Sequence, residues 1–214
     1  MYNPSHFTVT DAQPLHDLMR AHPLGMLVTH SDQGLDANHL PFELLVNDSE
    51  AVTLLAHVAR ANPVWQQVRS GSPVMVVFRA EQAYISPNWY PSKHAAHRQV
   101  PTWNYRVVHA HGTITVRDDE KFVRGVVGRL TRTHEHQTQA TAPQSHPAWK
   151  MSDAEPDYLQ QMLGAIVGIE IEVTRLEGKF KLGQNRSTED REGAADGVEA
   201  AGHPSLATRM RQSV

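Results

Sequence analysis

Apolar residues recur at every second position over several stretches of the chain, the pattern of a strand with one buried face. The clearest run covers residues 105–116, where Val108 and Ala110 share one face and His109 and His111 share the other. Shorter apolar or alternating runs predict strands over residues 24–29, 35–46, 51–58, 74–78, 82–86 and 168–174.

Apolar residues three or four positions apart predict helices between these strands. The helices are expected over residues 11–21, from Pro63 to about residue 70, from Asp118 and from Pro156. Residues 133–147 are polar and are predicted to form a loop. The chain from Ser187 onward is polar and rich in Ala and Gly, so residues 187–214 are predicted to be a weakly helical or disordered tail.

The order of these elements predicts one domain over residues 1–186, followed by the tail. Short strands interleaved with a few helices indicate an α+β class, mainly β, built on an antiparallel barrel with peripheral helices. A chain of 214 residues is long enough to bury one substantial core.

The overall charge argues against a strongly basic nucleic-acid binder, because 20 Lys and Arg face 23 Asp and Glu. No helix-turn-helix pair or basic stripe is present, so direct DNA reading is not supported by charge or motif. The absence of Cys excludes disulfides and thiolate metal sites. No signal peptide and no apolar run approaching 18 residues is found, so we expect a cytoplasmic protein without a membrane segment.

The stretch from Ser86 to Tyr105 concentrates aromatic residues, prolines and basic side chains. Trp89 and Trp103 lie within it, three prolines restrain its backbone, and Lys93 lies between its aromatic clusters. Flat apolar surfaces beside cationic donors suit a planar, anionic cofactor. The alternative is a proline-rich loop between two strands whose aromatic residues close one end of a barrel.

The segment AHVARANP, residues 56–63, is a candidate phosphate site. His57 ends a strand there, and Arg60 and Asn62 follow before the helix that is predicted to begin near Pro63. A helix N-terminus offers free N–H groups to an anion, and Arg60 could add a bidentate contact. The alternative is that Arg60 is a surface residue and that Asn62 caps the helix.

Two groups of histidines have spacings that could suit metal ligands, but no metal site is predicted from the sequence. His109 and His111 share one face of the longest predicted strand, but a zinc site needs a third ligand that no sequence pattern supplies. His134 and His136 flank Glu135 in a predicted loop. The alternative is that the strand pair lines a dimer seam or a ligand pocket.

Several ordered strings carry a resemblance to a known family. They are ANHLPF (37–42), AHVARANP (56–63), YISPNWYPSK (84–93), VPTWNY (100–105), VHAHG (108–112), IVGIEIEVTRLEGKFKL (166–182) and QNR (184–186). From Met1 to about Gly193 the chain resembles the PaiB-like family of FMN-binding transcriptional regulators. The resemblance implies an FMN-binding split barrel, the fold shared with pyridoxamine phosphate oxidases and flavin reductase-like proteins.

The same resemblance implies a homodimer with FMN at the interface and a role as a negative regulator of sporulation and degradative-enzyme genes. A different class stays open: an FMN-dependent oxidoreductase, flavin reductase-like, acting on an unknown small substrate. The high His count also leaves a haem-handling split-barrel protein open. No proton-donor pair or nucleophile stands out, so the sequence names no reaction.

The resemblance extends to individual residues. The strand over residues 35–46 would face the flavin, since Pro41 cannot donate to a neighbouring strand and leaves a bulge or an edge there. Trp103 would cover the ring and Asn104 would bond its edge, while Lys93 would neutralise the phosphate or the reduced ring. The alternatives are an ordinary bulge with His39 at the barrel rim, Trp103 and Tyr105 in the core of a dimer, and a Lys93 that only faces solvent. The predicted cofactor-binding residues are Asn38, His39, Pro41, His57, Arg60, Asn62, Lys93, Trp103, Asn104, Lys181, Gln184 and Asn185.

One position departs from the family. The family usually has Ser where this chain has Gly183. If that hydroxyl contacts the flavin or its phosphate, its loss removes one hydrogen bond, a net effect of about 1 kcal/mol.

Overall fold

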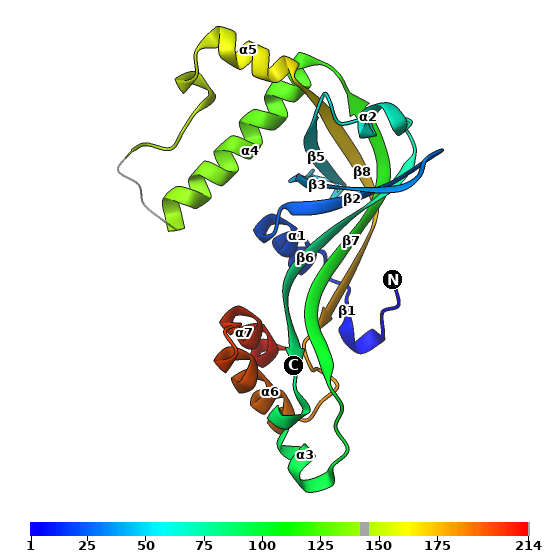
Figure 1. Ribbon diagram of the computed structural model, residues 1–214, viewed down its shortest axis with the longest axis vertical. Coiled ribbons are helices and arrows are strands. Elements are labelled where there is room, and N and C mark those ends of the chain that lie inside the picture. Colours follow the sequence, from blue (N-terminus) through cyan, green and yellow to red (C-terminus); the bar gives the residue numbers. More distant parts are fainter. Residues whose placement is uncertain (142–145, 214) are drawn as a thin grey trace. The chain divides into compact units, whose positions relative to one another are not determined.

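The computed structural model describes residues 1–141 and 146–213. The strands are β1 Thr8–Val9, β2 Leu24–Ser31, β3 Gly34–Pro41, β4 Glu43–Val46, β5 Val52–Ala59, β6 Pro73–Ile85, β7 Thr102–Arg117 and β8 Ile166–Lys181 (Figure 1). The α-helices are α1 Ala12–Ala21, α2 Val64–Gln67, α3 Pro91–Ala96, α4 Glu120–Thr141, α5 Pro156–Gly164, α6 Thr188–Ala200 and α7 Pro204–Gln212. Short 3-10 helices cover Ser5–Phe7 (η1), Pro87–Trp89 (η2) and Met151–Asp153 (η3).

The strands form one eight-stranded sheet in the order β3-β2-β6-β7-β8-β5-β4, and β1 pairs with β8. The chain divides into two compact units. Unit 1 comprises residues 1–18, 78–109 and 177–214, and unit 2 comprises residues 19–77 and 110–176. The strands β6, β7 and β8 contribute residues to both units.

In unit 2 the sheet curls upon itself. Its first and last strands, β3 and β4, are consecutive in the chain and separated only by Phe42, and β3 also lies beside β5. The predicted strand over residues 35–46 is therefore divided after Pro41, where the next amide, that of Phe42, donates instead to the Pro23 carbonyl at 2.9 Å. The predicted interruption at Pro41 is confirmed. At this point the chain passes from β3, at one end of the strand order, to β4, at the other end.

The helix α4 packs on β5 within unit 2. Val126 and Leu130 are buried against Leu55. The prediction of a loop over residues 133–147 is wrong for residues 133–141, which continue α4, and residues 142–145 lie outside the described part of the chain. Once a docked apolar face has nucleated a helix, extending it through polar residues costs little, so polarity alone did not end the helix.

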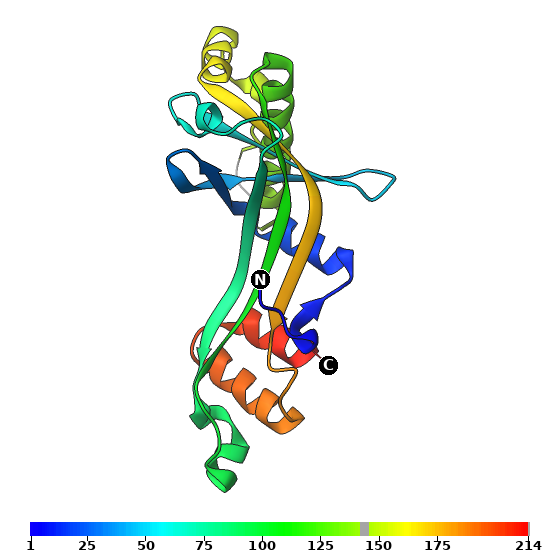
Figure 2. The same ribbon diagram turned by 90° about the vertical axis from the view of Figure 1, so that its right-hand side faces the viewer.

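In unit 1 the helices α6 and α7 lie side by side (Figure 1 and Figure 2). Their apolar residues form a core with residues of β6 and with Tyr90. Gly193 and Gly197 face η2 so closely that a Cβ at either position would overlap Trp89. The segment expected to be weakly helical or disordered thus contains two packed helices, because their apolar residues share a core and the two glycines allow close contact with Trp89.

None of the helices within residues 1–141 and 146–213 is long and apolar enough to cross a membrane.

Candidate functional site

The predicted cofactor-binding residues fall into two groups. Unit 2 holds Asn38, His39, Pro41, His57, Arg60 and Asn62. Unit 1 holds Lys93, Trp103, Asn104, Lys181, Gln184 and Asn185.

Arg60 in unit 2 already has partners within the chain. Its Nη1 and Nη2 donate to the two carboxylate oxygens of Asp118 at 2.9 and 2.6 Å, and its Nε donates to the Gly164 carbonyl at 2.8 Å. The bidentate hydrogen bond raises the pKa of Arg60 and lowers the pKa of Asp118. The helix that follows, α2, is a single turn over Val64–Gln67, shorter than predicted. An anion at Arg60 would therefore have to compete with Asp118.

Asn62 joins two of the predicted segments. Its Oδ1 accepts a hydrogen bond at 3.0 Å from the amide of Val64, the first residue of α2, and its Nδ2 donates to the Asn38 Oδ1 at 2.7 Å. Asn38 in turn donates to Asp36 at 2.9 Å. The side-chain amides of Asn62 and Asn38 are both held by neighbours within the chain.

The remaining residues of the unit 2 group differ in exposure. His39 is exposed on β3, while Pro41 is half-buried at the end of that strand. His57 is half-buried on β5, burial lowers its pKa, and its buried Nδ1 has no hydrogen-bond partner in the described part of the chain.

Unit 1 gathers cationic side chains at the end of β8. Lys179 is buried, and its Nζ donates to the Tyr2 carbonyl at 3.0 Å. Lys181 donates to the Thr102 hydroxyl, and Arg186 follows five residues later in the chain. Within residues 1–141 and 146–213, none of these three cations forms a salt bridge. Burial, followed by the positive charges of Lys179 and Arg186, lowers the pKa of Lys181.

A tight turn follows the two lysines. Gly183 has a φ of +92°, and its carbonyl accepts the Arg186 amide at 2.9 Å. Gln184 closes the turn on itself, because its Oε1 accepts the Leu182 amide at 2.8 Å and its Nε2 donates to the Phe180 carbonyl at 2.6 Å. Gln184 therefore shapes the turn, and its amide is already used by the backbone.

Two polar side chains border this turn. Asn104 is 2% exposed. Its Nδ2 lies 3.8 Å from the position that a Cβ on Gly183 would take, and the Arg191 Cγ lies 3.6 Å from that position. The buried Nε of Arg191 lacks a hydrogen-bond partner in the described part of the chain. The turn is thus bordered by the carboxamide of Asn104 and by one unused N–H donor, that of Arg191.

The other unit 1 residues lie near the surface. Trp103 is 54% exposed and meets Tyr84 edge to face at a centroid distance of 6.2 Å. Lys93 on α3 donates to the Asn88 side chain at 2.9 Å. Asn185 is exposed at the turn.

A buried carboxylate holds the cationic region in place, and the sequence reasoning missed it. Asp190 on α6 accepts hydrogen bonds from the Ser92 amide at 3.0 Å, the Ser92 hydroxyl at 2.7 Å and the Gln99 Nε2 at 3.1 Å. Gln99 in turn accepts the Arg186 Nη1 at 2.8 Å. The one local signal was Ser187 three residues before Asp190, the spacing of a helix cap, and the Ser187 hydroxyl does accept the Asp190 amide at 3.3 Å.

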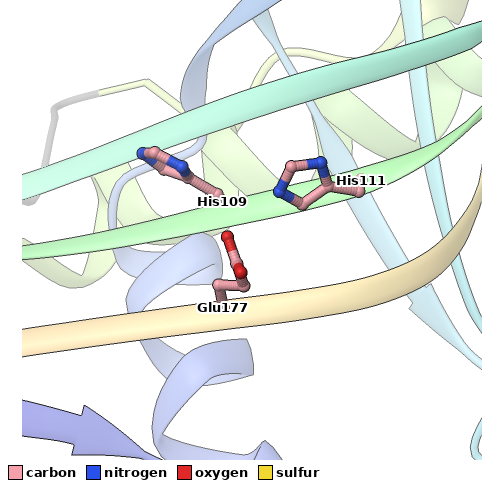
Figure 3. A group of neighbouring side chains, drawn as sticks. All are labelled: His109, His111 and Glu177. Atoms are coloured by element: carbon pink, nitrogen blue, oxygen red, sulfur yellow. The ribbon is translucent and has the colours of Figure 1, made fainter. Parts of the chain in front are cut away.

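Beside the histidine pair on β7 lies a third residue, Glu177, that no sequence pattern indicated. Figure 3 shows His109 and His111 of β7 with Glu177 of β8. One ligand-type atom of each lies within 4.8 Å of the others, and all three residues are half-buried.

Comparison with known proteins identifies the kind of domain. The model of the family described as "Putative FMN-binding domain" matches residues 1–175. FMN, the cofactor predicted from the sequence, is the one that this family's description names, and the predicted resemblance is confirmed.

Relatives and solved structures agree with this match. "Protease synthase and sporulation protein PAI 2" of Bacillus subtilis is 30% identical over 191 residues, covering 89% of this chain and 85% of that protein. The structure of the FAD and heme binding protein from Mycobacterium smegmatis is 18% identical with a TM-score of 0.58, covering 91% of this chain and 80% of that one. The flavocytochrome Anf3 from Azotobacter vinelandii is 12% identical with a TM-score of 0.56, covering 88% and 75%. These likenesses concern the fold, and the predicted class of antiparallel split barrel is confirmed.

Proposed function

This chain belongs to the FMN-binding domain family, and from that premise we propose that two copies of it bind FMN at their shared interface and act as a negative regulator of gene expression. The regulatory part rests on the similarity to the Bacillus subtilis sporulation protein, which extends over 89% of the chain.

The observation that carries the cofactor proposal is the local group of cationic side chains at the end of β8 in unit 1. Lys179 is buried and Lys181 is half-buried, and neither forms a salt bridge within the described residues. Removing a charge from water without an opposite charge beside it is costly, so we expect an anion to complete this site. FMN carries a phosphate, and its flat ring matches the exposed aromatic residues nearby.

The exposed aromatic surface of unit 1 supports the dimer. Trp103 and Tyr84 are 54% and 47% exposed, and Val100 is 66% exposed. Large apolar side chains that gather on a surface mark a binding face more often than scattered ones do. A second copy of the chain, with the flavin ring between the two, would remove this surface from water.

The regulator is expected to act through flavin state or a bound ligand more than through strong DNA affinity. The net charge of −3 and the missing helix-turn-helix pair disfavour tight DNA binding. We expect weak, salt-sensitive DNA binding, and nanomolar operator binding at physiological salt would contradict this.

The proposal is tested first by the absorption spectrum of the freshly purified protein and by its mass in solution. The expected protein is yellow, releases FMN on heating and has the mass of a dimer. Continued turnover of NADPH would favour the flavin-dependent oxidoreductase instead, and a Soret band after haem titration would favour haem handling. A colourless monomer that does not bind added FMN would refute the proposal.

A further inference from the structure

We propose that the phosphate of FMN binds in unit 1, at the turn that begins at Gly183, and not at Arg60. The ligands would be the cationic groups of Lys181 and Arg186, assisted by the Asn104 carboxamide and by the unused Nε–H of Arg191. This inference rests on the proposed FMN-binding function and specifies which residues hold the phosphate monoester.

The charge balance around the turn favours an anion. Lys181 has a neutral hydroxyl as its hydrogen-bond partner, and Arg186 is oriented by the amide oxygen of Gln99. The nearby buried acid, Asp190, is engaged by Ser92 and Gln99 and forms no salt bridge within the described residues. Two cations are thus fixed beside the turn by uncharged groups, which leaves their charge for a ligand.

Donors beside the turn point to the same place. Asn104 is almost fully buried, and its Nδ2 lies 3.8 Å from the position that a Cβ on Gly183 would take. The buried Nε of Arg191 has no hydrogen-bond partner in the described part of the chain. Buried donors are normally satisfied, and phosphate oxygens can accept several hydrogen bonds at once.

Gly183 provides the space. A Cβ at this position would lie between the Arg191 Cγ at 3.6 Å and the Asn104 Nδ2 at 3.8 Å. Because glycine lacks that atom and tolerates the φ of +92°, the backbone can approach a ligand closely here. Turns of this kind are a common setting for phosphate groups.

Arg60 has fewer hydrogen-bond donors left for an anion. Asp118 occupies two of its nitrogens, the Gly164 carbonyl takes its Nε–H, and the Ile166 carbonyl lies 3.3 Å from its Nη2. In unit 2, Arg60 follows β5 and joins the end of that strand, through hydrogen bonds, to residues far along the chain.

The test compares FMN with riboflavin, which has the same ring but no phosphate, by titration of flavin fluorescence. The full-length protein should bind FMN more tightly than riboflavin. Lys181→Met or Arg186→Gln should lower FMN affinity by about ten- to a hundredfold, the range for one charged hydrogen bond, and leave riboflavin affinity unchanged. Arg124→Gln, which removes an exposed charge on α4, is the matched control and should change neither affinity.

A pair of glycine variants tests the space at the turn. Gly183→Ala should weaken FMN more than riboflavin. Gly202→Ala imposes nearly the same backbone strain, at φ +91°, but nothing lies within 4 Å of its Cβ. It should therefore leave both affinities unchanged, and circular dichroism verifies that each variant is folded.

Each outcome decides between the alternatives. Equal binding of FMN and riboflavin by the wild type overturns the inference, and so does a preference for FMN that survives Lys181→Met but is lost in Arg60→Ala. If neither flavin binds, the proposed function fails, and inorganic phosphate then tests the anion site alone. A rise in Tm with phosphate in the wild type that is lost in Lys181→Met supports the site, and no rise refutes it.

Discussion

The contact between α6 and η2 gives a sharp test of how the C-terminal segment is held. A Cβ added to Gly193 would overlap the carbonyl oxygen of Trp89 and would lie 2.9 Å from the Pro91 Cδ. Gly125, inside α4, is the matched control, since nothing lies within 4 Å of the Cβ that it would gain. The two substitutions make the same chemical change in a helix interior and differ only in what the new methyl group meets.

The magnitudes follow from two opposing effects. Replacing glycine by alanine inside a helix is favourable by roughly 0.5–1 kcal/mol, so Gly125→Ala is expected to stabilise the protein by that amount. Forcing a methyl group into a packed site costs about 1–3 kcal/mol. The group that Gly193→Ala meets is backbone, which no rotamer change can move, so a net loss of about 1–2 kcal/mol is expected.

Thermal and urea unfolding, followed by circular dichroism and by tryptophan emission, measure both variants. For a chain of this size each kcal/mol shifts Tm by about 2–4 °C. Gly193→Ala should therefore melt several degrees below Gly125→Ala. If Gly193→Ala were as stable as Gly125→Ala, the close packing of α6 on Trp89 would be refuted.

Three further predictions address other parts of the chain. Asp190→Ala leaves the donors of Ser92 and Gln99 unpaired in a buried place, so a loss of roughly 1–3 kcal/mol is expected in urea unfolding, and an unchanged midpoint would contradict the network. Burial lowers the pKa of His57 in the folded state below its ordinary 6.5. The unfolded chain therefore takes up a proton first as the pH falls, so stability is retained above pH 6.5 and lost below it. His57→Gln should flatten this dependence between about pH 7.5 and 5.5, and identical curves would show that another group causes it. Trp103→Ala should weaken FMN binding by about two- to twelvefold, the equivalent of 0.5–1.5 kcal/mol of ring contact, and Trp149→Ala serves as the control in the same fluorescence titration.

The sequence predicted the β-strands where the pattern was local. Alternation predicted a strand over residues 105–116, and β7 spans Thr102–Arg117. The strand that was expected to end at Thr174 continues to Lys181, because β1 pairs with it at Gly178 and Lys179. Alternation reports which residues face a core, but it cannot report which distant segment supplies hydrogen bonds to the strand's end.

The family and its cofactor also followed from the sequence, since ordered strings such as ANHLPF and VPTWNY are readable without coordinates. Which of the predicted anion-binding residues are already paired did not follow. Arg60 looked available until the fold placed Asp118, 58 residues away, against its guanidinium. Lys181 was predicted to bind the cofactor, but only the fold shows that burial and the charges of Lys179 and Arg186 lower its pKa.

The sequence by itself thus determined the class of fold and the family, because both depend on patterns of neighbouring residues. Only the tertiary structure decided which charges are already paired, which buried donors are unused and where a glycine leaves room. Those properties depend on distances between residues far apart in the chain, and such distances exist only once the chain has folded.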